Sequence, residues 1–264
     1  MSQSGNPDPS PGPDPGDEVI DLREATGPPA HRVPSGRPAA LLPDHHLELV
    51  TGGDRWVQLE AFVYDIYRQV GYCEESPRRR VEELARWDDR SRFHAVFDGD
   101  DEPVGVVRTI LGPYDELPVG KFTRTDFRDP DPVCELSSLT VRTDVRSTGV
   151  IEHLYRAGWL DALQRGASAV VALIDQWLLD VFVETYHLPF TVIGVAREYM
   201  GGVPVPAGLP LGGQHYRPMA ASNPDFWAWT LEAMTADEAE AWSMPPVGAA
   251  TRTEAGPASA SGRG

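Results

Sequence analysis

The hydrophobic positions of the chain recur either at helical spacing or in the alternation typical of strands. An apolar series before Gly71 repeats every three or four residues, which predicts an amphipathic helix; its members are Trp56, Leu59, Phe62, Val63, Ile66, Tyr67 and Val70. Residues 93–97 and 104–111 flank the turn-forming run 98–103 and predict a β-hairpin. Residues 47–50 predict a short strand before the helix.

The stretch 134–165 predicts a strand, a loop and a helix, around which the rest of the chain is arranged. From Glu135 to Arg142 the period is two, which predicts a strand with Leu136 and Thr140 on one face and Leu139 on the other. The apolar series that follows has helical spacing and comprises Ile151, Leu154, Tyr155, Gly158 and Ala162. The loop 146–149 therefore leads directly into the N-terminus of a helix. Free backbone N–H groups and the helix dipole favour a phosphate there, and Arg146 adds a positive charge.

The remainder of the chain continues the alternation of strands and helices. Residues 169–174 are apolar throughout, as in a strand buried on both faces, and Asp175 is positioned to cap a helix that ends near Pro189. Residues 190–195 predict a further strand. We expect the last strand near 214–217 and a helix over 224–242, whereas 111–131 fits a long connection.

Composition bounds the domain organisation and the class of partner. Residues 1–45 and 245–264 are rich in Pro, Gly and small residues and predict disordered tails, which leaves 46–244 as one domain. The net charge of −17 argues against a nucleic acid partner. Two cysteines are too few for a disulfide framework, and neither a signal peptide nor a membrane-spanning run is recognisable, so we expect a cytoplasmic location.

The central stretch resembles the core motif of the GCN5-related N-acyltransferase (GNAT) superfamily, in which an Arg/Gln-x-x-Gly-x-Gly/Ala loop follows strand four. Arg146 and Gly149 match that loop, and Ile151 departs from it. A narrower resemblance lies in residues 135–141, ELSSLTV, which are similar to the Glu-x-Ser-Arg-Phe/Leu-x-Val strand of acyl-homoserine-lactone synthases and N-acyl amino acid synthases; Ser138 replaces the arginine. The resemblance extends from about residue 59 to 142, and more thinly to 211.

The resemblance implies an α/β (α+β) fold with a GNAT-like mixed sheet that splays between strands four and five, flanked by helices. In such a fold the strand-four backbone at Leu139, Thr140 and Val141 pairs with a pantetheine arm as an added strand. The loop formed by Arg146, Ser147, Thr148 and Gly149 would hold the phosphates of the donor. No permanently bound cofactor is implied; acyl-CoA or acyl-phosphopantetheine serves as a co-substrate.

The same resemblance suggests catalytic and acceptor-binding residues. Glu135 would be the general base that takes a proton from the acceptor amine; the alternative is a structural ion pair with Arg108 or Arg142. Arg68, Asp88 and Arg108 would shape the acceptor side, although an ion pair across the hairpin explains Asp88 and Arg108 equally well. Tyr186 lies near the position of a thiolate-protonating tyrosine, and a core role is the alternative.

Other chemistries find less support in the sequence. The histidines lack metal-ligand spacing, so no metal site is predicted, and Ser137 and Ser138 lie outside a Gly-x-Ser-x-Gly elbow. Arg78, Arg79 and Arg80 form the densest basic cluster, which suits an acidic acyl carrier protein or, alternatively, pairs with neighbouring glutamates.

Two functional hypotheses follow from these residues. The first is an N-acyltransferase that moves an acyl group from acyl carrier protein or CoA to the amine of a small molecule such as an amino acid derivative. The second, motivated by Ser138 and Ile151, is a catalytically silent relative that binds or reports an acyl thioester.

Overall fold

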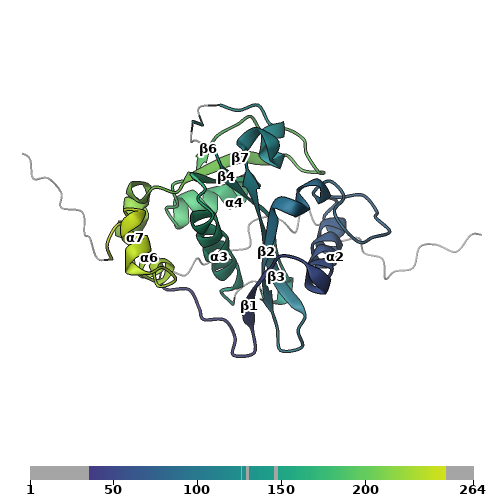
Figure 1. Ribbon diagram of the computed structural model, residues 1–264, viewed down its shortest axis with the longest axis horizontal. Coiled ribbons are helices and arrows are strands. Elements are labelled where there is room, and N and C mark those ends of the chain that lie inside the picture. Colours follow the sequence, from purple (N-terminus) through teal and green to yellow (C-terminus); the bar gives the residue numbers. More distant parts are fainter. Residues whose placement is uncertain (1–35, 126, 129–130, 146–147, 248–264) are drawn as a thin grey trace, which may run out of the picture. The chain divides into compact units, whose positions relative to one another are not determined.

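The computed structural model describes residues 36–125, 127–128, 131–145 and 148–247. Across these residues the strands form one seven-stranded sheet in the order β1-β2-β3-β4-β5-β7-β6. Every neighbouring pair is antiparallel except β4 and β5, which run parallel. The sheet is therefore mixed and flanked by helices, which confirms the predicted fold class (Figure 1).

The order of the elements follows the predicted alternation. The strands are β1 (His46–Val50), β2 (Ser91–Phe97), β3 (Pro103–Gly112), β4 (Val133–Val141), β5 (Ala169–Ile174), β6 (Thr191–Val192) and β7 (Val205–Pro210). The α-helices are α2 (Gly53–Gln69), α3 (Val150–Gln164), α4 (Gln176–Asp180), α5 (Arg217–Ser222), α6 (Pro224–Leu231) and α7 (Ala236–Ala241). A π-helical turn, Val181–Thr185, continues α4, and 3-10 turns cover Ala85–Arg90, Tyr114–Glu116, Pro118–Lys121, Thr143–Val145 and Gly213–Tyr216.

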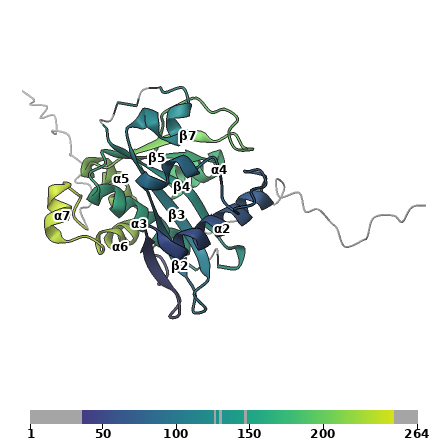
Figure 2. The ribbon, with the colours of Figure 1, turned by 45° about the vertical axis from the view of Figure 1, so that its right-hand side comes forward.

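Helices cover both faces of the sheet. The amphipathic helix α2 buries Trp56, Leu59 and Val63 against one face, together with β2, β3 and the segment 114–127. The helix α3 covers the other face, and α5, α6 and α7 pack beside it through Trp159 and Trp227. Figures 1 and 2 both show α2 and α3 on opposite sides of the strands, with α6 and α7 next to α3.

A β-bulge in β4 interrupts the alternation that the sequence suggests. Arg108 of β3 pairs with Ser137 and Val106 pairs with Thr140, so two residues of β4 lie opposite Val107 alone. Ser138, at φ 50°, adopts the left-handed conformation that occurs in one type of β-bulge. The prediction that Leu136 and Leu139 face opposite sides was therefore wrong: both pack on the α3 face, because the extra residue reverses the alternation.

The parallel contact between β4 and β5 is short. Only the pairs Cys134 with Val170 and Glu135 with Val171 join the two strands. Beyond Glu135 the strands diverge, while β4 remains paired with β3 as far as Val141. The predicted splay between these strands is thus present, and it leaves one edge of β4 without a partner strand.

The sequence located the C-terminal elements less well. The last strand is β7, between β5 and β6, and the predicted strand at 214–217 is a 3-10 turn that leads into α5. Pro206 and Pro210 masked the strand signal, since proline is normally absent from paired strands. The predicted strand 190–195 is reduced to β6, and the predicted helix 224–242 is broken between α6 and α7, where Thr235 begins α7 with a capping box.

None of the helices among the described residues is long and apolar enough to cross a membrane. Residues 36–45 and 245–247, which the sequence assigns to tails, contain no helix or strand. Some of them nevertheless contact the domain: the Trp227 indole donates to the carbonyl of Pro245 at 2.8 Å. The domain boundaries at 46 and 244 stay predictions.

A buried carboxylate fixes α3 to the hairpin. Asp161, 4% exposed, accepts hydrogen bonds from Thr109 Oγ1 at 2.7 Å and from the guanidinium groups of Arg92 at 2.9 Å and Arg165 at 3.1 Å. Burial acts to raise the pKa of Asp161, but His94, Thr109 and Arg165 favour the charged form more strongly and hold that pKa below its usual range. The sheet and α3 are therefore joined by an ionic network centred on a buried carboxylate.

Asp161→Ala should lower the free energy of unfolding by about 1–3 kcal/mol, because it leaves the buried Thr109 hydroxyl and the partly exposed guanidinium groups of Arg92 and Arg165 without their partner. Asp115→Ala, at an exposed position of the 114–116 turn, is the control and should change it by less than about 0.5 kcal/mol. Urea denaturation of both variants near neutral pH measures the difference. Equal stabilities would show that the network does not hold α3 in place.

Candidate functional site

Glu135 lies on the α2 face of β4 at the last residue pair before the strands diverge. Its side chain is buried, 1% exposed, and Oε2 accepts a hydrogen bond from the backbone amide of Val119 at 2.9 Å. Burial raises the pKa of Glu135 to about 8, although the Val119 amide and the charges of Arg108 and Lys121 act to lower it. Near neutral pH this carboxyl group can both release and accept a proton.

The structure brings Arg108 and Asp88 together as an ion pair. Arg108 is 2% exposed and donates to Asp88 Oδ1 at 3.0 Å, to Ser91 Oγ at 2.9 Å and to the carbonyl of Leu84 at 3.1 Å. The ion pair considered for Asp88 and Arg108 is therefore present, and their contribution to the acceptor side stays a prediction. Among the described residues, Glu135 makes no ion pair with Arg108. The Glu135–Arg108 pair considered as a structural alternative is therefore absent there.

A tyrosine cluster at the end of α2 reaches the opening between β4 and β5. The Tyr67 hydroxyl lies close to the side chain of Ser138, in the β4 bulge; burial raises the pKa of Tyr67, and Ser138 acts more weakly to lower it. The Tyr72 hydroxyl donates to Asp175 Oδ2 at 3.3 Å, and Asp175 directly follows β5. The rings of Tyr67 and Tyr72 meet edge to face with centroids 5.6 Å apart. Residues from α2, β4 and β5 thus border the opening on the α2 face.

Sequence reasoning missed these contributions to the site. Tyr67 was assigned only to the apolar face of its helix, and Asp175 only to a helix cap, where its side chain makes no capping hydrogen bond. Tyr72 follows the predicted helix stop at Gly71 and carried no signal of its own. Their proximity depends on α2 crossing the sheet, which a local pattern does not specify.

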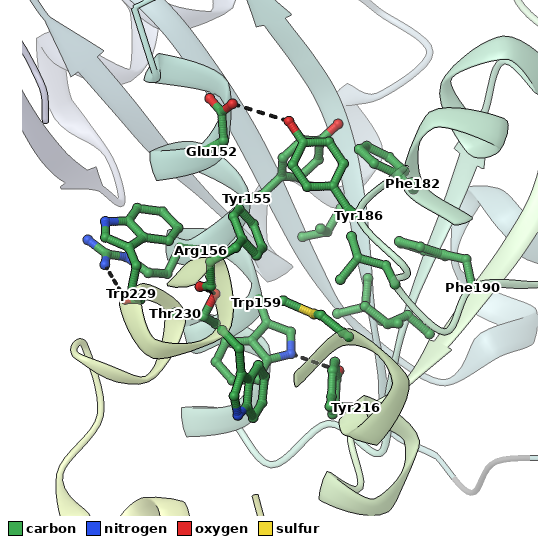
Figure 3. Close-up of a pocket in the computed structure, with 17 residues that line it drawn as sticks. Glu152, Tyr155, Arg156, Trp159, Phe182, Tyr186, Phe190, Tyr216, Trp229 and Thr230 are labelled. Carbon is green, nitrogen blue, oxygen red and sulfur yellow. Dashed lines mark hydrogen bonds between the residues drawn. The ribbon is translucent and has the colours of Figure 1, made fainter. Parts of the chain in front are cut away.

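An apolar cavity lies on the α3 face, beside the same opening. Its volume is about 60 Å³, and its floor is formed by Leu136 of β4, Val170 of β5 and Leu209 of β7. Side chains from α3, the π-helical turn, α5 and α6 complete the wall, including Tyr155, Trp159, Phe182, Phe190, Trp227 and Trp229 (Figure 3). The cavity is thus walled mainly by aromatic rings.

Tyr186 lines this cavity and not the Glu135 side of the sheet. Its hydroxyl donates to Glu152 Oε1 at 3.2 Å, as Figure 3 shows. Burial, followed by the nearby charge of Glu152, raises the pKa of Tyr186 well above its usual range, so the hydroxyl stays protonated. The buried hydroxyl of Tyr155, another wall residue, has no hydrogen-bond partner among the described residues.

The predicted donor-binding residues lie along the open edge of β4 and at the start of α3. Leu139, Thr140 and Val141 belong to the part of β4 that β5 does not pair, so backbone groups on that edge are available to a ligand. Gly149 is the N-cap of α3 with φ 83°. Thr148 Oγ1 donates to the carbonyl of Val145 at 2.7 Å. Arg146 and Ser147 lie outside the described residues.

The other arginines that the sequence analysis proposed for binding mostly interact with groups of the chain itself. Arg68 is exposed and donates to the carbonyl of Cys73 at 2.9 Å, which ties down the segment after α2. Arg79 pairs with Asp65, and Arg80 pairs with Glu82 at 3.1 Å. Arg78 is exposed and bonds to Ser76 Oγ through its backbone amide at 3.2 Å. No group of His, Cys, Asp and Glu suited to a metal ion occurs in the part of the chain that the structure describes.

Comparison with known proteins identifies the fold. No family model matches the chain, and no curated protein matches its sequence. A CoA-dependent acyl-homoserine lactone synthase, BjaI, solved with MTA, superposes with a TM-score of 0.53 at 18% identity, over 77% of this chain and 92% of that chain. The acyl-homoserine lactone synthase LasI superposes with a TM-score of 0.53 at 11% identity, over 65% and 92%. A structure of TofI in a ternary complex with an inhibitor and MTA gives 0.51 at 16% identity, over 66% and 96%. The chain therefore has a GNAT-like acyltransferase fold.

Glu135→Gln should stabilise the protein relative to the wild type increasingly as the pH rises from about 4.5 to 8. The raised pKa of Glu135 means that the unfolded chain ionises first, so the wild type loses stability through this interval and loses no more above it. Thermal unfolding of both proteins across pH 4–9 measures the difference. Glu75→Gln, at an exposed position, is the control and should show no such trend.

A difference between Glu135→Gln and the wild type that stays constant with pH would show that Glu135 is not a buried, proton-retaining carboxyl group.

Proposed function

We propose that this protein is an N-acyltransferase that moves an acyl group from a pantetheine thioester to the amine of a small molecule. One observation carries the proposal: the opening between β4 and β5 has a buried carboxyl group, Glu135, on one face and an apolar cavity on the other. A thioester lying in the opening would direct its acyl chain to the cavity and its carbonyl carbon to an amine entering from the α2 face. The GNAT-like fold supports this arrangement.

The donor would bind as an added strand on the free edge of β4. Backbone groups between Leu136 and Val141 have no partner on β5, and the amides of a pantetheine arm can pair with them as a strand does. Such pairing fixes the thioester without side-chain specificity. Specificity for the acyl group then comes from the cavity that begins at Leu136.

In the proposed reaction the amine nitrogen attacks the thioester carbonyl, the new C–N bond forms and the C–S bond breaks. The proton lost by the amine passes to Glu135, which must be ionised to accept it. Because Glu135 is only 1% exposed, we place a bridging water between the amine and its carboxylate. The departing thiolate takes a proton from Tyr186, although the raised pKa makes this hydroxyl a weaker acid than an ordinary tyrosine. Exchange with solvent then reprotonates Tyr186 and deprotonates Glu135, so both groups return to their starting states.

The acceptor would enter beside Tyr67, Tyr72 and Asp175. The Asp175 carboxylate makes no ion pair among the described residues, so its charge is available to an ammonium group arriving before deprotonation. The bond from Tyr72 orients this carboxylate. A small cationic amine, such as an amino acid derivative, fits this side of the opening.

The cavity suits a short acyl chain. A cavity of about 150 Å³ is known to take a benzene ring, and the cavity here is about 60 Å³, so we expect chains of roughly two to four carbons. Its aromatic wall excludes water from the thioester.

Purified protein incubated with short-chain acyl thioesters and a panel of amines should form amides detectable by mass spectrometry. Turnover should rise with pH through about 8 as Glu135 ionises, because the base acts only when deprotonated. Glu135→Gln should lower kcat by about 10²–10⁴-fold, the usual contribution of a general base, and remove this limb of the pH profile. Glu75→Gln should match the wild type.

The same assay separates the proposal from a catalytically silent relative. Binding of a pantetheine thioester without any amide product would favour the silent alternative, and normal turnover by Glu135→Gln would remove Glu135 as the base.

Phe190→Ala should shift the preferred acyl chain to greater length. Phe190 lines the cavity and stacks on Phe182 at 5.6 Å, so its removal enlarges the cavity. Competition between donors of two to ten carbons measures the ratio of their kcat/KM values, which should move toward the longer chain by about 10-fold, as expected for one or two extra methylenes. Val192→Ala, 56% exposed on β6, should leave the ratio unchanged. An unchanged ratio in Phe190→Ala would place the acyl chain elsewhere.

A further inference from the structure

The segment 36–41 crosses the N-terminal end of α3 before the chain enters β1. Figure 1 shows it passing from beside α6, below α3, to β1. Arg37 makes a two-point ion pair with Glu232, which follows α6, at 2.5 and 2.6 Å. Pro38 is buried, and Leu41 packs against the core cluster that contains Val145, Val150 and Leu154. The segment is therefore anchored on both sides of α3.

The backbone of this segment lies against the helix N-terminus. The carbonyl oxygen of Ala39 would be 2.7 Å from a Cβ at Gly149, so it approaches closely only because Gly149 has no side chain. The same oxygen is 3.2 Å from Nε2 of His153, which can donate to it. His153 is held in turn by an edge-to-face contact with Trp229 at 5.1 Å.

This carbonyl occupies a position that favours an anion. An α-helix N-terminus carries partial positive charge and attracts negative atoms such as phosphate oxygens. Here the negative end of a peptide dipole lies beside the N-cap residue and receives a side-chain hydrogen bond from the first turns of the helix. The chain thus fills, with its own backbone, space beside Gly149 that a phosphate of the donor would otherwise use.

Nearby described cations are also engaged internally. Arg156 donates to the carbonyl of Trp229 at 2.8 Å and lies over its ring. Arg142 pairs with Asp144 at 2.8 Å and Asp98 at 3.3 Å. Arg37, in its pair with Glu232, is engaged in the same way. A donor phosphate that binds any of these arginines must therefore compete with the partner that the arginine already has in the folded chain.

We propose that residues 36–41 are a donor-specificity element, which excludes the diphosphate of a nucleotide-bearing thioester such as CoA from the N-terminus of α3 while it is seated there. The inference rests on the proposed function. A pantetheine thioester that carries no phosphate places no anion at this position, and its amide groups still pair with β4. CoA binds only after the segment leaves the start of α3. The free energy that holds the segment there therefore reduces the binding free energy of CoA.

The test compares the full-length wild type with Arg37→Ala/Leu41→Ser, which removes an anchor on each side. Isothermal titration calorimetry with CoA and with pantetheine, which carries no phosphate, reports binding without turnover. The double variant should bind CoA about 10-fold more tightly, which corresponds to roughly 1.4 kcal/mol of lost competition. Its affinity for pantetheine should change by less than about twofold. Leu42→Ser, 43% exposed directly after the segment, should behave as the wild type.

A second measurement does not depend on a variant. Hydrogen exchange of the wild type should become faster across residues 36–45 when CoA is added and stay unchanged with pantetheine. The amide of His45, which donates to the carbonyl of Leu42 at 2.9 Å, lies in this segment.

If pantetheine binds but the double variant gains no CoA affinity and exchange does not respond to CoA, the specificity element is refuted while the proposed function stands. If neither compound binds to either protein and no amide forms, both fail together.

Discussion

The structure depends on the brief pairing of β4 with β5. Two residue pairs hold the parallel strands together, and β4 then continues along β3 alone. A strand edge buried without partners would leave backbone N–H and C=O groups unsatisfied, at a cost comparable to a lost hydrogen bond for each group. The open edge is stable only where solvent or a ligand completes it. This constraint places the candidate site at the divergence.

The two faces of the sheet divide the proposed chemistry. On the α2 face the bulge at Ser138 meets Tyr67, and the carboxyl group of Glu135 is covered by the Val119 amide. On the α3 face Leu136 opens an aromatic cavity. Burial disfavours the charged form of both side chains. It raises the pKa of Glu135 to about 8 and raises the pKa of Tyr186, whose hydroxyl stays protonated. A buried carboxyl group and a buried tyrosine hydroxyl therefore lie on opposite sides of one opening.

The start of α3 carries a second constraint. Gly149 gives space for a close approach, and that space is used by the carbonyl of Ala39 from the chain's own N-terminal side. A glycine-containing loop before a helix is consequently compatible with two occupants, a phosphate or a backbone segment. In the described structure, the segment and His153 form the contact.

Local sequence patterns were sufficient for the elements of the central domain. The apolar spacing of α2 and α3, the hairpin of β2 and β3, and the buried strand β5 all follow from periodicity, because each buries one stripe or both faces in a regular way. The motif around Glu135 predicted the strand that bears it, and the resemblance predicted the splay. The strand β7 was not predicted, because its prolines are typical of a loop. Pairing with β5 stabilises this strand although its local propensity is low.

The tertiary structure alone decided which side chains share the site. The bulge at Ser138 reverses the faces of β4, a one-residue change that no alternating pattern reveals. Tyr72 and Asp175, which are 103 residues apart, meet only because α2 crosses the sheet toward the end of β5. Likewise, Ala39 and His153 are separated by 114 residues and meet at the start of α3. Periodicity encodes which residues are buried, since burial depends on the local repeat; it does not encode which buried or bordering groups meet, since that depends on how the elements pack.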